Sequence, residues 1–142
     1  MIFGFTGTRK GMTIMQKAMF RTMLTLWNGD KFHHGDCLGA DQQAGDLAKT
    51  HGCFIEIHPP SDPKFRARCK GDIIHPEKPY LYRDKDIVNA CDFMVGTPRG
   101  MKEELRSGTW ATIRYAKKIN KRLTIIYPDG SVEHFNDVIP TF

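Results

Sequence analysis

The chain has 142 residues, of which 40% are hydrophobic and 26% charged, and its formal net charge at pH 7 is +5. This length and composition are typical of one globular domain over residues 1–142, and they exclude a disordered tail and a membrane protein, because no apolar run approaches the roughly 20 residues that cross a bilayer. The basic excess favours an anionic partner such as a phosphate, a nucleotide or a nucleic acid.

Short apolar runs alternate with helical patterns along the chain. The runs that we interpret as strands cover residues 2–5, 31–34, 53–58, 92–96, 122–127 and 132–135. The segments with helical periodicity cover residues 13–28, 42–50, 83–91 and 107–119. The first helix begins with a capping box of Thr13 and Gln16. We interpret residues 61–80 as a long surface loop.

This order predicts an α/β fold with three layers, in which helices cover both faces of a Rossmann-like, doubly wound, mostly parallel sheet. The last two strands form a short C-terminal hairpin. The first residues of the chain lack a charged segment and a cleavage site of the secretory type, so we expect a cytoplasmic protein with no membrane contact.

Ligands of open parallel sheets bind beyond the carboxyl ends of the strands, and these exits carry glycines, hydroxyls and cations here. Backbone amides at the following helix starts are expected to face an anion. Three such turns at equivalent places predict a site for a phosphate-bearing small molecule. The candidate ligand-binding residues are Gly7, Thr8, Arg9, Lys10, Gly35, Asp36, Gly39, Ala40, Asp41, Arg83, Pro98, Ser107, Gly108 and Thr109.

Several of these residues also have a structural interpretation. Gly7 suits a tight strand-to-helix turn, and Thr8 and Ser107 suit helix caps. Asp36 and Asp41 are as consistent with helix capping as with ligand contact. These alternatives stay open at the level of sequence.

The cysteines and histidines do not indicate a metal site or a cofactor. The four cysteines form no C-x-x-C pair, and the six histidines show no H-x-x-x-H spacing. We therefore expect reduced thiols and no metal. His33 and His34 are adjacent in a strand and must point to opposite faces of the sheet.

Several segments together resemble the YspA-type branch of the SLOG superfamily, which groups the LOG cytokinin-activating phosphoribohydrolases with the DNA-processing protein DprA. The resemblance extends from Gly4 to about Pro128. It implies a Rossmann-like fold that binds nucleotides or nucleotide-derived signals, as a homodimer or larger homo-oligomer. The segments that carry it are Gly4-Phe5-Thr6-Gly7-Thr8-Arg9, His34-Gly35-Asp36-Cys37-Leu38-Gly39-Ala40-Asp41, Leu81-Tyr82-Arg83-Asp84-Lys85-Asp86-Ile87-Val88, Cys91-Asp92 and Ser107-Gly108-Thr109-Trp110.

The LOG enzymes carry a P-G-G-x-G-T-x-x-E motif with an upstream arginine, and the resemblance implies that Arg83 matches this arginine. The catalytic glutamate then falls at Thr112, which has no carboxylate, and residues 101–106 interrupt the motif. Cleavage of a glycosidic bond normally requires a carboxylate. The catalytic candidates that remain are Arg83, Asp36, Asp41 and Glu104.

We therefore favour a module that binds a nucleotide or an ADP-ribose-like ligand as a sensor, carrier or scavenger. The alternative is an N-glycosidase or phosphoribohydrolase that acts on nucleoside 5'-monophosphates. A third hypothesis, DprA-like binding of single-stranded nucleic acid, rests on the basic residues of the segment 64–70 and is disfavoured because no groove-reading motif accompanies them. An assembly through the apolar helix 110–119 would pack that helix against a second copy.

Overall fold

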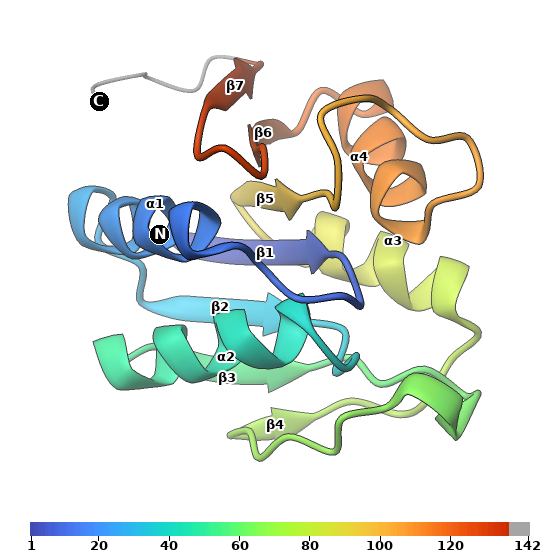
Figure 1. The fold of residues 1–142 in the computed structure, drawn as a ribbon. Helices are drawn as coiled ribbons and strands as arrows, with labels where there is room; N and C mark the ends of the chain where they lie inside the picture. Colours follow the sequence, from blue (N-terminus) through green and yellow to red (C-terminus); the bar gives the residue numbers. More distant parts are fainter. Residues whose placement is uncertain (137–142) are drawn as a thin grey trace.

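The structure, a computed structural model, describes residues 1–136 and contains one sheet with the strand order β4-β3-β2-β1-β5-β6-β7 (Figure 1). The strands are β1 (Ile2–Gly7), β2 (Lys31–His34), β3 (Phe54–Ile57), β4 (Ile73–Ile74), β5 (Phe93–Thr97), β6 (Arg122–Ile126) and β7 (Val132–Phe135). All neighbouring strands pair in parallel except β6 and β7, which are antiparallel. The predicted fold class, including the C-terminal hairpin, is confirmed.

The helices cover both faces of this sheet. They are α1 (Ile14–Leu26), α2 (Ala40–His51), α3 (Tyr80–Ala90) and α4 (Gly108–Lys118). One apolar cluster packs α1 and α2 on one face, through residues such as Phe20 and Ala44, and a second packs α3 and α4 on the other, through Ile87 and Trp110. Within residues 1–136, none of the helices combines the length and the hydropathy that a membrane span requires.

The start of α1 is occupied by contacts within the protein. The predicted capping box is present, since Gln16 N donates to Thr13 Oγ1 at 3.1 Å and Thr13 N donates to Gln16 Oε1 at 3.0 Å. The buried Gln16 side chain also donates to the carbonyls of Pro98 and Ile126, each at 2.9 Å. The start of α1 therefore ties the ends of β5 and β6 together, so the expectation that it faces a ligand does not hold.

The segment 61–80 has more structure than the sequence predicts. It contains a 3-10 turn (Pro63–Phe65) and the two-residue edge strand β4, in which Ile73 pairs with Glu56. Asp72 Oδ2 accepts a hydrogen bond from Ile55 N at 2.8 Å and thereby fastens this edge to β3. A two-residue strand has no detectable alternation, which is why the pattern indicated only a loop.

The apolar face of α4 packs within the chain. Trp110, Ile113 and Ala116 are buried in the cluster that α4 forms with α3 and the sheet. The structure therefore corrects the prediction that this face packs against a second copy, because the face is already buried within the chain.

Candidate functional site

A cavity of about 660 Å³ lies at the carboxyl edge of the sheet, where the strand order reverses beside β1. Ligands of doubly wound folds bind at this position, because the helices that follow the two central strands leave toward opposite faces. The predicted residues that line the cavity are Gly7, Thr8, Arg9, Lys10, Gly35, Asp41, Arg83, Glu104, Ser107, Gly108 and Thr109. The predicted residues outside its lining are Asp36, Gly39, Ala40 and Pro98.

The N-terminus of α4 opens into this cavity with unused donors. Ser107 Oγ accepts a hydrogen bond from Trp110 N at 3.2 Å and caps the helix. The amides of Gly108 and Thr109, which precede it in the first turn, have no hydrogen-bond partner among residues 1–136. Because the helix dipole places partial positive charge at the same point, this turn is suited to an anion.

Packing within the protein does not explain why residue 108 is glycine. A Cβ built on Gly108 would meet only Tyr80 Cε2, at 3.6 Å, which is ordinary van der Waals contact. Gly7 differs, because a Cβ there would collide with the side chains of Thr97 and Ala40. Gly7 is therefore explained by the close approach of β1, β5 and α2, whereas the space in front of Gly108 belongs to the cavity.

The loop after β1 contributes a hydroxyl and cations. Thr8 N donates to Thr97 O at 3.1 Å, and Thr8 Oγ1 accepts from Lys10 N at 3.2 Å, so the loop folds around Thr8. The Arg9 guanidinium lies 3.9 Å from the centroid of the Phe65 ring, which also lines the cavity. Arg9 is thus held over an aromatic ring by a cation–π contact rather than by an acid.

The amides of Gly35, Cys37 and Ala40 in the loop after β2 are already hydrogen-bonded within the protein, contrary to the sequence prediction. Asp41 Oδ2 accepts hydrogen bonds from Gly35 N at 3.2 Å and from Cys37 N at 3.3 Å. Ala40 N donates to Thr8 O at 3.0 Å. The Asp41 carboxylate thus occupies two of the amides that an anion would otherwise bind. Burial raises the pKa of Asp41 to about 7, against the opposing effect of Arg83.

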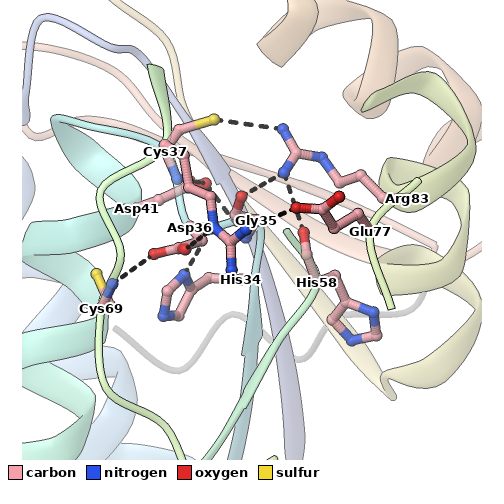
Figure 2. Close-up of polar contacts among 10 residues, drawn as sticks. His34, Gly35, Asp36, Cys37, Asp41, His58, Cys69, Glu77 and Arg83 are labelled. Carbon is pink, nitrogen blue, oxygen red and sulfur yellow. Dashed lines mark hydrogen bonds and ion pairs between the residues drawn. The ribbon is translucent and has the colours of Figure 1, made fainter. Parts of the chain in front are cut away.

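Asp36 anchors the segment that follows β3 and does not reach the cavity. Its Oδ1 accepts from Cys69 N at 2.8 Å and its Oδ2 accepts from Arg66 Nε at 3.2 Å (Figure 2). Arg66 also pairs with Glu77 at 2.9 Å. Arg66, one of the basic residues that suggested nucleic-acid binding, is therefore used to hold the loop in place.

Arg83 lies at the centre of the polar contacts beneath the cavity (Figure 2). Its Nε donates to Asp84 Oδ1 at 2.6 Å, its Nη1 to the carbonyls of Gly35 and His58, and its Nη2 to Cys37 Sγ at 3.3 Å. A guanidinium carries five N–H donors, so these contacts leave one on Nη2 for a ligand. Burial opposes the charge of Arg83, but Asp84 and Asp41 outweigh this effect and hold the pKa of the guanidinium above its usual value.

Asp84 is a cavity residue that the sequence analysis did not single out. Its carboxylate is buried beside Arg83 and near the Thr112 hydroxyl of α4, which itself donates to the Gly108 carbonyl at 3.0 Å. Burial raises the pKa of Asp84, while Arg83 and Thr112 oppose this shift. The position where the LOG motif places its glutamate therefore has a carboxylate beside it, supplied from α3. Asp84 directly follows Arg83 in the sequence, which could have indicated that the two residues share a site. Consecutive residues of a helix, however, normally point in different directions.

Arg106 is the second residue that was missed, and it changes the charge of the cavity rim. Arg99 Nε pairs with both carboxylate oxygens of Glu104 at 3.0 Å, which removes this pair from ligand binding. Arg9, Lys10 and Arg106 line the cavity and form no ion pair among residues 1–136. Three cations therefore face a cavity whose buried carboxylates are already partnered.

Comparisons with known proteins identify the fold. No protein-family model matches the sequence, and no curated protein does. Among solved structures, the molybdenum cofactor binding protein from Rippkaea orientalis superposes with a TM-score of 0.67 at 17% identity, over 89% of this chain and 76% of that one. The molybdenum cofactor carrier protein MCP from Chlamydomonas reinhardtii gives 0.61 at 21% identity, over 87% and 74%. The protein TM1055 gives 0.61 at 14% identity, over 87% and 72%. The chain shares the fold of these proteins.

Proposed function

We propose that this chain binds a small phosphate-bearing ligand of the nucleotide class in the 660 Å³ cavity, with the phosphate at the N-terminus of α4. The observation that carries the proposal is the pair of Gly108 and Thr109 amides, which have no hydrogen-bond partner within residues 1–136 and open into this cavity at a glycine that packing does not require. A helix N-terminus of this kind binds phosphate through its amides and its dipole.

The charges and shape of the cavity support the same ligand class. Arg9, Lys10 and Arg106 would balance the negative charge of a phosphate. Tyr80 also lines the cavity and would provide a flat apolar surface for a heterocyclic ring. A ligand with a phosphate at one end and a planar ring at the other would use both features.

Two further considerations favour binding as the primary activity. The resemblance to the YspA-type branch of the SLOG superfamily implies nucleotides or nucleotide-derived signals. Two structural neighbours are proteins that bind or carry the molybdenum cofactor. We therefore infer a sensor, carrier or scavenger role, and the molybdenum cofactor joins the nucleotides as a ligand to be tested.

The test compares ligands that differ only in phosphate. Thermal stabilisation and calorimetric titration with AMP, ADP and ADP-ribose are expected to show saturable binding, while adenosine binds at least tenfold more weakly. The molybdenum cofactor is measured in the same way. Equal affinity for adenosine and AMP, or no binding of any member of the panel, would refute the proposal.

A matched pair of variants places the ligand in this cavity. Arg106→Gln removes a cation from the cavity lining, whereas Lys102→Gln removes an exposed cation from the same loop outside the lining. The proposal predicts weaker AMP binding for Arg106→Gln and unchanged binding for Lys102→Gln. Equal effects of the two variants would show that only the overall charge matters.

Asp84 favours a second candidate function, the N-glycosidase or phosphoribohydrolase activity. Its buried carboxylate lies beside Arg83 and Thr112, and a carboxylate with a raised pKa is suited to general acid–base catalysis. Chromatography of the AMP mixtures after incubation distinguishes the functions: a receptor returns AMP intact, and a hydrolase releases adenine.

A further inference from the structure

Three histidines and a glutamate share one face of the sheet at its β4 edge. In the parallel register, His33 of β2 lies beside Glu56 of β3, and Glu56 lies beside Ile73 of β4. Side chains two residues apart along a strand point to the same side, so His58 and His75, which follow β3 and β4, share the face of Glu56. The backbone continues this register, since His75 N donates to Ile57 O at 2.8 Å.

The four side chains are in direct contact. His33 Nδ1 lies 2.8 Å from His58 Nε2, and the rings of His58 and His75 stack with their centroids 4.2 Å apart. Glu56 reaches both outer histidines, with Oε1 at 3.0 Å from His75 Nε2 and Oε2 at 3.5 Å from His33 Nε2. One ring nitrogen from each of the three histidines lies within 4.8 Å of the others.

Two of the three histidines are buried, so most of the cluster is shielded from solvent. His33 is 4% exposed and His58 is 6% exposed, and the Glu56 side chain beside them is 12% exposed. His75 is about one-third exposed and leaves a route from solvent.

We propose that His33, His58 and His75 form a binding site for one divalent transition-metal ion of the zinc class, with Glu56 orienting two of the three imidazoles. A carboxylate accepts hydrogen bonds and does not donate them, so Glu56 holds the proton on Nε2 of His75 and, at longer range, of His33. Their Nδ1 atoms then carry the lone pairs. Carboxylates commonly orient metal-binding histidines in this way.

Binding of the ion requires the rings to reorient, because the His58 and His75 rings are stacked within 14° of parallel and an imidazole binds a metal in its own plane. Nitrogens that bind Zn²⁺ at 2.0–2.1 Å in a tetrahedral site are about 3.4 Å apart. The separations of the cluster, from 2.8 Å between His33 and His58 up to 4.8 Å, bracket this value. On binding, His58 moves its proton from Nε2 to Nδ1, and the hydrogen bond between His33 and His58 is replaced by two bonds to the metal. The fourth position is left for water or an external ligand.

This site is distinct from the proposed nucleotide site. His33, Glu56, His58 and His75 are absent from the lining of the large cavity. The main-chain carbonyl of His58 accepts a hydrogen bond from Arg83 at 3.1 Å, while the His58 ring turns away from Arg83 (Figure 2). The sequence predicted no metal because its histidines show no short ligand spacing, whereas these ligands come from three different strand ends.

The test uses untagged protein, freed of metal by a chelator, and Co²⁺ and Zn²⁺ as probes. The proposal predicts one Co²⁺ per chain with visible d–d absorption, displaced by one equivalent of Zn²⁺. His75→Gln is expected to weaken Zn²⁺ binding at least tenfold, because it removes a ligand at a partly exposed position. His51→Gln changes an exposed histidine of α2 outside the cluster and is expected to leave the affinity unchanged.

Three results would overturn the proposal. These are the absence of stoichiometric binding, equal affinity of the His75→Gln variant and the unaltered protein, and an intense near-ultraviolet band from cobalt bound to a cysteine thiolate. A urea titration of the metal-free His75→Gln protein confirms that it is folded, and Glu56→Gln provides a second variant. The predicted loss for Glu56→Gln is smaller, since Glu56 only orients the ligands.

Discussion

The Arg83 guanidinium of α3 donates a hydrogen bond to the main-chain carbonyl of His58 at 3.1 Å and another to the carbonyl of Gly35. It therefore joins the ends of β3 and β2 to a helix on one face of the sheet. Arg83, a ligand-binding and catalytic candidate from the sequence, is thus first a structural bridge, with one donor left over for a ligand.

Replacing Arg83 is expected to affect stability strongly. Arg83→Lys keeps the charge but cannot reach Asp84, Gly35, His58 and Cys37 together, because a lysine lacks the planar fork of donors. We expect a loss of about 2–4 kcal/mol in the free energy of unfolding, measured by urea denaturation, because buried carboxylates lose their partner. Arg114→Lys alters a partly exposed pair with Glu103 and is expected to cost less than about 1 kcal/mol. Equal losses for the two variants would contradict the bridging role.

Gly108→Ala separates ligand binding from folding. The added Cβ meets only Tyr80 Cε2 at 3.6 Å, so the melting temperature is expected to stay the same or rise slightly. The methyl group occupies the space in front of the first turn of α4, where we place the phosphate. AMP binding, measured by calorimetry, should weaken at least tenfold, which corresponds to about 1.4 kcal/mol. Retained affinity would exclude this turn as the phosphate site.

Asp84→Asn tests the hydrolase alternative. The amide keeps the shape of the side chain but removes the carboxylate that lies beside Arg83 and Thr112. If the protein releases adenine from AMP, this variant should lose at least a hundredfold in rate, the lower range for removal of a general acid or base. Asp86→Asn, on the same helix but paired with Lys78 at 2.6 Å, should retain the rate. Release that is equally fast in both variants would exclude Asp84 from catalysis.

His34 is expected to make the protein less stable in mild acid. Burial lowers the pKa of His34 from 6.5 to about 4, so the unfolded chain binds a proton at pH 5 that the folded protein does not. Stability is therefore lost as the pH falls from 6.5 toward 4. Asp41 acts in the opposite direction, because its pKa is raised to about 7 by burial. A comparison of variants isolates the contribution of His34.

The measurement is urea unfolding at pH 7 and pH 5. Between these values the unaltered protein should lose about 2 kcal/mol more than His34→Gln, given the lowered pKa of His34 and 1.36 kcal/mol per pKa unit. His51→Gln, which changes an exposed histidine of α2, should behave like the unaltered protein. An unchanged pH dependence in His34→Gln would show that His34 is not a buried neutral imidazole.

The layers of the fold could be predicted from sequence because local patterns and packing agree. The capping box of Thr13 and Gln16 marks the start of α1, and the residues of β2 and β7 were predicted with the bounds that the structure shows. β4 was missed because its two residues obtain their structure from pairing with Glu56 and Ile57 rather than from a pattern of their own.

The site was predicted from the residues in the turns that follow the strands. The sequence of a turn does not show which of its amides already donate hydrogen bonds within the folded protein. Asp41 looked like a ligand contact or a cap, and only the folded loop shows it accepting from Gly35 and Cys37. In the same way, the approach of Asp84 to Thr112 and the histidine cluster depend on contacts between residues far apart in the chain. Such contacts leave no short-range signal in a single sequence.

The most direct test of the phosphate site is a titration of ¹⁵N-labelled protein with AMP, followed by NMR of the backbone amides. Binding of phosphate at the first turn of α4 predicts large, saturable shifts of the Gly108 and Thr109 amide signals, with little change at Gly130 in the turn between β6 and β7. Adenosine should leave Gly108 and Thr109 nearly unshifted. Saturable AMP binding with these two signals unmoved, or no binding at all, would contradict the account.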